Sequence, residues 1–246
     1  MERGSVPSEL LAIDDVGIAF GGVAALDGAS FAVRRGSACG LIGPNGAGKS
    51  TLLNCISGFA RPDRGRIAID GRETSRLRPH DVARLGVART FQHLGLLERC
   101  SVRDNVRLGC LAGTRSRRRA FASADALLER LGLGDVAGER PGVLDQGALR
   151  RVELARALAG DPQLVLLDEP LSGLAREEAE SLVALLAQLR DEGQLTLVVV
   201  EHNLGLLTEL VDRLVVLDCG RTLAAGESRA VLADPAVVEA YLGTAA

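Results

Sequence analysis

The chain has 246 residues, of which 47% are hydrophobic and 25% are charged, and its formal net charge is −3 at pH 7. This composition is typical of a globular protein and excludes the fibrous and disordered classes. The small negative charge and the 2% content of aromatic residues disfavour a broad nucleic-acid-binding surface, so we expect no nucleic acid partner. No run approaches the roughly 20 apolar residues that span a bilayer, and the first residues lack a secretory hydrophobic region, which favours a cytoplasmic protein.

The N-terminal part of the sequence predicts short strands and then a strand, a loop and a helix. Hydrophobic residues alternate with small or polar ones around 18–20 and 31–33, between glycines, which predicts a meander. The apolar run 38–42 predicts a buried strand, and a glycine-rich turn separates it from a helix expected over 49–57. A further strand around 67–69 is expected to end in a hairpin turn.

The middle of the sequence has helical periodicity, whereas the C-terminal third alternates apolar runs with helical stretches. Helices are expected over 102–111, 122–131, 148–159 and 176–191, and strands over 164–167, 195–200 and 215–217. Strands that are apolar on both faces and that alternate with helices are typical of a parallel sheet covered on both sides.

We therefore expect an α/β fold with a mainly parallel sheet, an N-terminal antiparallel β subdomain and an inserted α-helical subdomain. The predicted nucleotide-binding core comprises residues 1–92 and 161–225. The helical subdomain is predicted at 93–160, and residues 226–246 are expected to form a short helical tail.

The turn after the strand at 38–42 matches the pattern G-x-x-x-x-G-K-[ST] of a phosphate-binding loop. Its residues are Gly43, Pro44, Asn45, Gly46, Ala47, Gly48, Lys49, Ser50 and Thr51. In such a loop the backbone N–H groups surround the β-phosphate, the lysine reaches the β- and γ-phosphates, and the serine hydroxyl binds Mg²⁺. Lys49 is the only lysine in a sequence whose other basic residues are arginines. The pattern predicts a P-loop nucleoside triphosphatase core that takes ATP and Mg²⁺.

An acidic pair follows the apolar run at 164–167. Asp168 and Glu169 come at the carboxyl end of the predicted parallel strand, where open α/β sheets bind their ligands. We expect Asp168 to face the Mg²⁺ ion and Glu169 to activate the water that attacks the γ-phosphate. An Asp-Glu pair alone is more often a solvated turn, but the strand and the phosphate-binding loop favour the catalytic interpretation.

Together these motifs resemble those of the ATP-binding cassette (ABC) ATPases over nearly the whole chain. Gln92, in the segment 88–93, is similar to the glutamine of that family that senses the γ-phosphate, and the resemblance implies that it joins Ser50 and Asp168 at the metal. His202, in the segment 200–203, is similar to the family's switch histidine, which implies a catalytic role beside Glu169 and Lys49. Phe20 stands where the family has an aromatic residue that stacks on adenine.

Within this family, the segments 20–22, 88–92 and 238–243 are similar to ATPase subunits of branched-chain amino-acid importers. The resemblance implies a peripheral subunit on the cytoplasmic face of the membrane. It also implies transmembrane permease subunits as partners, a second ABC ATPase subunit, and indirectly an extracytoplasmic solute-binding protein. Importers of urea or short amides share much of this pattern and remain an alternative.

The sequence departs from the family at the signature segment, which usually reads Leu-Ser-Gly-Gly-Gln. Here Asp145 stands in place of the serine, and Gly147 is retained. In the family this segment reaches the γ-phosphate bound by the partner subunit, and an aspartate there would repel that phosphate. The hypothesis is a heterodimer in which the partner supplies an intact signature. The alternative is that Asp145 is only a helix N-cap.

Two other interpretations remain open on the sequence alone. A soluble ATPase that acts on DNA or ribosomes is disfavoured, because the interval between Lys49 and Asp168 leaves no room for a long coiled-coil insertion. A regulatory nucleotide-binding subunit with weak hydrolysis is compatible with the altered signature.

Overall fold

The computed structural model describes residues 9–91, 94–110, 117–193 and 195–242. One antiparallel sheet has the order β2-β1-β4-β5, with the bounds Glu9–Phe20 (β1), Val23–Arg34 (β2), Arg64–Ile69 (β4) and Arg72–Glu73 (β5). The second sheet has the order β10-β9-β3-β8-β7-β6, with the bounds Ala38–Ile42 (β3), Val87–Arg89 (β6), Leu164–Asp168 (β7), Thr196–Val200 (β8), Arg213–Asp218 (β9) and Arg221–Glu227 (β10). Its strands are parallel except for β10, which confirms the expected α/β class.

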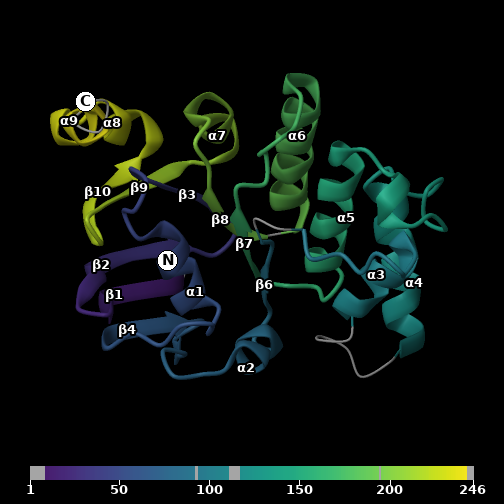
Figure 1. Ribbon diagram of the computed structural model, residues 1–246, viewed down its shortest axis with the longest axis horizontal. Coiled ribbons are helices and arrows are strands. Elements are labelled where there is room, and N and C mark those ends of the chain that lie inside the picture. The colour runs from purple at the N-terminus through teal and green to yellow at the C-terminus, as the bar shows by residue number, and fades with distance from the viewer. Residues whose placement is uncertain (1–8, 92–93, 111–116, 194, 243–246) are drawn as a thin grey trace, which may run out of the picture.

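The helices lie on the two faces and at one end of the second sheet (Figure 1). Their bounds are Lys49–Ile56 (α1), Pro79–Arg84 (α2), Val102–Gly109 (α3), Arg117–Arg130 (α4), Gln146–Leu158 (α5), Arg176–Gly193 (α6), Leu204–Leu210 (α7), Ser228–Leu232 (α8) and Pro235–Leu242 (α9). Helix α1 lies beside the antiparallel sheet, whereas α5, α6 and α7 lie across the second sheet from it, with α3 and α4 beyond α5. Within the described ranges, no helix combines the length and the hydropathy that crossing a membrane requires.

The central strands are buried on both faces, and alternate residues serve two separate cores. Leu164 and Leu166 of β7 pack in a cluster with α1 and the antiparallel sheet, whereas Val165 and Leu167 pack in a cluster with α5, α6 and α7. Because side chains alternate along a strand, one short apolar run holds the two layers together. The carboxyl ends of β3, β7 and β8 are thereby fixed side by side.

Several elements lie outside what the periodicity predicted. Strands β1 and β2 have 12 residues each, and register shifts interrupt their pairing, so the alternating pattern is visible only in parts. Helix α2 and the strands β6 and β10 were not anticipated. Helices α3, α4 and α5 all fall within 93–160, the segment predicted as the helical subdomain, and α8 and α9 follow the end of β10 at Glu227.

Candidate functional site

The predicted phosphate-binding loop joins β3, which lies between β8 and β9, to the first turn of α1. Gly43, Gly46 and Gly48 have φ angles of 147°, 82° and 102°. A Cβ atom at Gly43 would overlap the carbonyl oxygen of Leu217, and one at Gly48 would lie 2.5 Å from the carbonyl oxygen of Ala25. The loop therefore needs glycine both for its backbone conformation and for its close approach to β2 and β9.

Lys49 is buried at the start of α1, and its ammonium group is held by the loop itself. Lys49 Nζ donates to the carbonyl oxygens of Gly43, at 2.6 Å, and Pro44, at 2.9 Å. Burial lowers the pKa of Lys49, and the nearby carboxylates of Glu169 and Asp168 oppose this shift. The cation is thus enclosed by the loop and by the acidic pair, where it can exchange its carbonyl partners for phosphate oxygens.

Asp168 is the last residue of β7 and is buried. Its backbone N–H donates to Thr90 Oγ1 at 3.3 Å, and its Oδ2 accepts from Arg89 Nη2 at 3.0 Å. The side chains of Arg89 and Asp168 are only 6% and 8% exposed. A carboxylate at this depth requires a cationic partner, and in this structure the partner is a guanidinium group.

Glu169 follows in a left-handed backbone conformation, with φ of 52°. Its N–H donates to the carbonyl oxygen of Val200 at 2.9 Å, which holds the residue after β7 against the end of the neighbouring strand β8. Its Oε1 lies 3.1 Å from Nε2 of His202, a residue that follows β8. Non-glycine residues with positive φ are uncommon and often occur at functional sites, and here the conformation brings the carboxylate to the imidazole.

A cavity of about 210 Å³ joins these elements. Its lining comprises Ala25 of β2, residues 45–51, Glu169 and His202. The structure thus brings the loop, the second acidic residue and the histidine to one hollow. Phe20 is 56% exposed in the hairpin between β1 and β2 and does not line the cavity. Gln92 lies outside the described residues.

Asp145 and Gly147 lie at the N-terminus of α5. Asp145 is the N-cap, and its Oδ1 accepts from the N–H of Ala148 at 2.7 Å. Glu178 of α6 reaches the same turn, because a Cβ atom at Gly147 would lie 2.6 Å from its Oε1. Two carboxylates therefore offset the partial positive charge at this helix end.

Two buried acidic residues, Glu201 and Glu153, hold the segments around this site. The sequence did not indicate their contacts. Glu201 accepts from the N–H of Leu171 at 2.6 Å and from that of His202 at 3.2 Å, and burial raises its pKa. It ties the turn after the acidic pair to the histidine. The sequence signal that could have indicated this role is that Glu201 directly precedes His202 in the motif 200–203.

Helix α5 holds the chain on both sides of residues 92–93. Glu153 Oε1 accepts from the N–H of Phe91 at 2.9 Å, and burial raises the pKa of Glu153. Arg156 donates to the carbonyl oxygens of Gly95, at 2.6 Å, and Leu94, at 2.9 Å. Residues 153 and 156 are three apart and so lie on one face of the helix, which Arg150 shares through its ion pair with Glu153.

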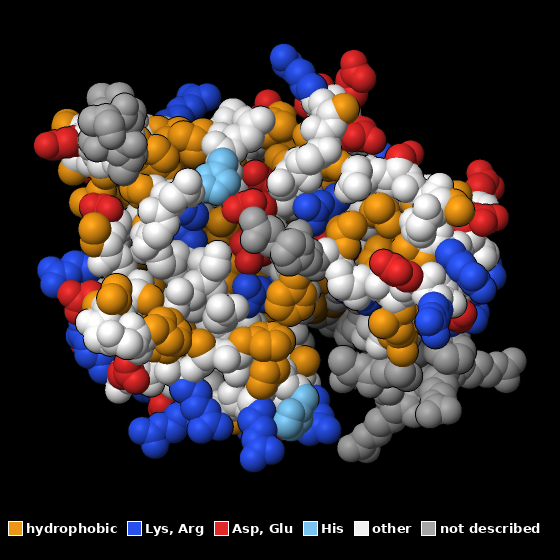
Figure 2. Space-filling model, in the orientation of Figure 1, with side chains coloured by type: hydrophobic (Ala, Val, Ile, Leu, Met, Phe, Trp, Pro, Cys, Tyr) orange, Lys and Arg blue, Asp and Glu red, His pale blue; other side chains and the backbone are white. Residues whose placement is uncertain are grey.

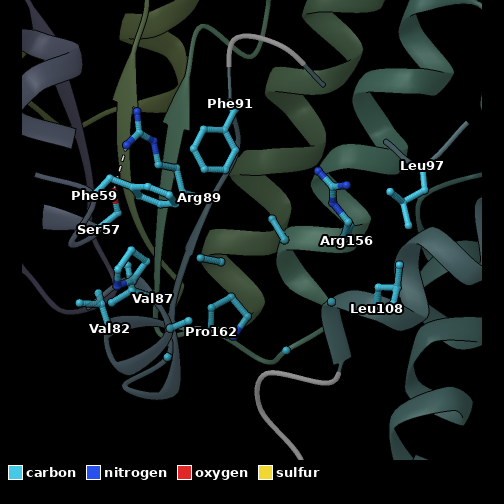
Figure 3. A pocket seen from close by; sticks show the side chains of 17 residues that line it. Ser57, Phe59, Val82, Val87, Arg89, Phe91, Leu97, Leu108, Arg156 and Pro162 are labelled. Carbon is cyan, nitrogen blue, oxygen red and sulfur yellow. Dashed lines mark hydrogen bonds between the residues drawn. The ribbon is translucent and has the colours of Figure 1, made fainter. Parts of the chain in front are cut away.

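A second, larger hollow, here called the groove, lies between α2 and β6 on one side and α3 and α5 on the other. It has a volume of about 500 Å³, and the larger apolar side chains in its lining are Phe59, Pro79, Val82, Val87, Phe91, Leu97, Leu108 and Pro162. Figure 3 shows the two phenylalanines beside Arg89, with Leu97, Leu108 and Arg156 on the opposite wall. In Figure 2 hydrophobic side chains gather over β6 and α2, with Lys and Arg side chains below them.

Comparisons with known proteins agree with this arrangement. The family model described as "ABC transporter" matches residues 26–172. The chain is 36% identical to the high-affinity branched-chain amino acid transport ATP-binding protein BraF of Pseudomonas aeruginosa, over 96% of this chain and 98% of that protein.

Two solved structures are similar to this one. The ADP conformation of MJ1267, an ATP-binding cassette of an ABC transporter, has a TM-score of 0.87 at 32% identity, covering 96% of this chain and 99% of that one. The dimeric post-hydrolysis state of the cassette MJ0796, bound to ADP and phosphate, has a TM-score of 0.78 at 27% identity, covering 89% and 99%.

Proposed function

Because this chain belongs to the ABC transporter family, as an ATP-binding subunit and transport-coupled ATPase, we propose that it powers the import of branched-chain or related amino acids. The observation that carries the chemical part is the single cavity shared by the loop 45–51, Glu169 and His202. The similarity to BraF over nearly the full length of both chains supports the choice of solute.

In the proposed reaction the loop 43–51 binds the phosphates of ATP, and Lys49 turns from the loop carbonyls to the β- and γ-phosphates. Glu169 accepts the proton of the attacking water, and His202 orients this carboxylate from 3.1 Å away. Phe20, exposed at its hairpin, would stack on the adenine.

The residues present fit a magnesium ion that is held partly by ATP. The described residues contain no group of three or more His, Cys, Asp and Glu side chains that could hold a metal alone. Mg²⁺ is usually bound by one or two protein oxygens together with substrate phosphates, and Ser50, Asp168 and Gln92 would supply such donors. The ion would neutralise the charge that develops on the phosphates.

The groove is proposed to receive the permease subunits, which would hold the chain at the cytoplasmic face of the membrane. It is apolar, it opens between the nucleotide-binding part and the helices α3 and α5, and Phe59 in its wall is 58% exposed. Exposed apolar surface of this kind is typical of an interaction site.

Reconstitution with the neighbouring permease and binding-protein genes would test the solute. In vesicles loaded with ATP we expect uptake of leucine, isoleucine and valine that depends on this subunit, with Glu169→Gln as the inactive control. Uptake of urea or short amides without uptake of these amino acids would replace the proposed solute class and leave the ATPase assignment unchanged.

A heterodimer is proposed because the signature turn at α5 carries carboxylates. Asp145 accepts from the N–H of Ala148, and Glu178 lies against Gly147, so two carboxylates already offset the partial positive charge of this helix end. The partner's signature would then serve the ATP bound at Lys49, whereas this chain's own signature would serve the partner's ATP weakly. The dimeric state of the similar cassette MJ0796 supports a two-subunit arrangement.

Replacing Asp145 by serine tests this asymmetry. The serine keeps a capping oxygen but removes the negative charge, so we expect the chain alone to gain ATPase activity by about 5-fold or more. Purified wild-type chain should hydrolyse ATP slowly and should be stimulated by the partner subunit. Robust hydrolysis by the isolated wild-type chain, unchanged by Asp145→Ser, would contradict the heterodimer. Negligible turnover even in the assembled transporter would favour a regulatory subunit.

A further inference from the structure

The side chain of Arg89 contacts both the groove and Asp168 of the acidic pair. Its Nη2 donates to Asp168 Oδ2 at 3.0 Å, and its Nη1 donates to Asn54 Oδ1 at 2.7 Å and Ser57 Oγ at 3.0 Å. The guanidinium is thus held between the end of β7 and the end of α1. Figure 3 shows Arg89 at the wall of the groove, with its hydrogen bond to Ser57.

The same guanidinium also lies at the wall of the groove, beside Phe91. Its Cζ lies 5.0 Å from the centroid of the Phe91 ring, which is within the range of a cation–π interaction. Phe59 meets Phe91 edge-to-face, with 5.6 Å between the ring centroids, and both rings are exposed, by 58% and 37%. The side chain of Arg89 therefore lies between the exposed aromatic pair and Asp168 and contacts both.

We propose that Arg89 is a positioning residue that couples occupancy of the groove to the metal-binding carboxylate Asp168. This inference rests on the proposed function, in which Asp168 binds Mg²⁺ together with ATP. Without the ion, Arg89 supplies the positive charge that a buried carboxylate requires. Arg89 and the metal therefore compete for Asp168, and Phe91 sets how firmly the guanidinium is held.

The competition has a defined direction. Removing Phe91 loosens Arg89, weakens its hold on Asp168 and makes the carboxylate more available to Mg²⁺. Removing the charge of Arg89 has the same effect to a greater extent, because the buried carboxylate then has no other cation in contact among the described residues. A partner segment that moves the ring of Phe91 would change the metal requirement in the same way.

The experiment measures the Mg²⁺ concentration at which a fluorescent ATP analogue is half-maximally bound by the purified full chain. We expect Arg89→Gln to lower this concentration about 5-fold or more, and Phe91→Ala to lower it about 3-fold. Arg89→Lys, which keeps the charge, should stay closer to wild type. Leu223→Ala removes an exposed apolar side chain from β10, outside the groove and the nucleotide cavity, and is the matched control, with an unchanged metal requirement.

The double variant Arg89→Gln/Phe91→Ala decides whether the coupling passes through Arg89. It should match Arg89→Gln alone, whereas a full additional effect of Phe91→Ala would mean that Phe91 acts by another route, such as its neighbour Gln92, and would overturn the proposal. An unchanged metal requirement in both single variants would also overturn it. If Arg89→Gln does not fold, Phe91→Ala against Leu223→Ala remains a test. Failure of the wild-type chain to bind the analogue at any Mg²⁺ concentration would instead contradict the proposed function.

Discussion

Replacing Glu169 by glutamine should preserve ATP binding and slow hydrolysis about 100-fold or more. Glutamine keeps the size of the side chain, but it cannot accept the proton of the attacking water, and general-base catalysis typically contributes 10²- to 10⁴-fold. It also lacks the charge that attracts the imidazole of His202, 3.1 Å away in the structure. Single-turnover hydrolysis of bound ATP in the assembled dimer measures this effect separately from binding.

The matched control for this variant is Glu180→Gln. Glu180 lies on the exposed face of α6, where it pairs with Arg176 at 2.7 Å, and surface pairs of this kind contribute little. Its replacement should leave turnover within about 2-fold of wild type. Normal turnover in Glu169→Gln would show that Glu169 is not the base. His202 would then be the next candidate for this role.

Replacing Lys49 by alanine should weaken ATP binding by roughly 100-fold or more. Each hydrogen bond from a charged donor contributes about 1.5–3 kcal/mol, and loss of two such bonds to phosphate corresponds to at least this factor. Titration calorimetry with ATP and Mg²⁺ measures the affinity directly. The fold should survive, because the hydrogen bonds that Lys49 makes in the structure are to two carbonyl oxygens of its own loop, those of Gly43 and Pro44.

Lys49→Arg tests whether a positive charge at this position is enough for ATP binding or whether the compact ammonium group is required. The planar guanidinium keeps the positive charge but is larger and more rigid than the ammonium, and the position is buried under the loop. We expect it to restore only a small part of the affinity. ATP affinity within 3-fold of wild type in Lys49→Ala would contradict the assignment of the loop as the phosphate site.

The parts of the site that could be predicted from the sequence are those encoded locally. The loop 43–51 carries its glycines and its lysine within nine consecutive residues, and the pair Asp168 and Glu169 directly follows an apolar strand. Parallel strands then bring their carboxyl ends to one edge, so the meeting of the loop with Glu169 and His202 follows from the sheet.

The contacts that escaped prediction join residues far apart in the chain. Arg89 pairs with Asp168, and Glu178 reaches Gly147, through side-chain directions that no periodicity reports. The positive φ of Glu169 is likewise invisible, because glutamate has no preference for that conformation. Strand β6 has three residues, and the sequence of β10 does not alternate apolar with polar residues although its exposed and half-buried residues alternate, so neither gave a pattern that could be distinguished from a loop.

The N-terminal turn and the middle of helix α5 have different neighbours. Its 13 residues give it a length of about 20 Å, and its N-terminal turn carries Asp145, whereas its middle is bonded to Phe91 and, through Arg156, to Leu94 and Gly95. A rigid rod fixed in this way cannot be tilted at one end without displacing the other. A subunit that displaces the N-terminal turn of α5 would therefore also displace the segment at Phe91, which forms part of the wall of the groove.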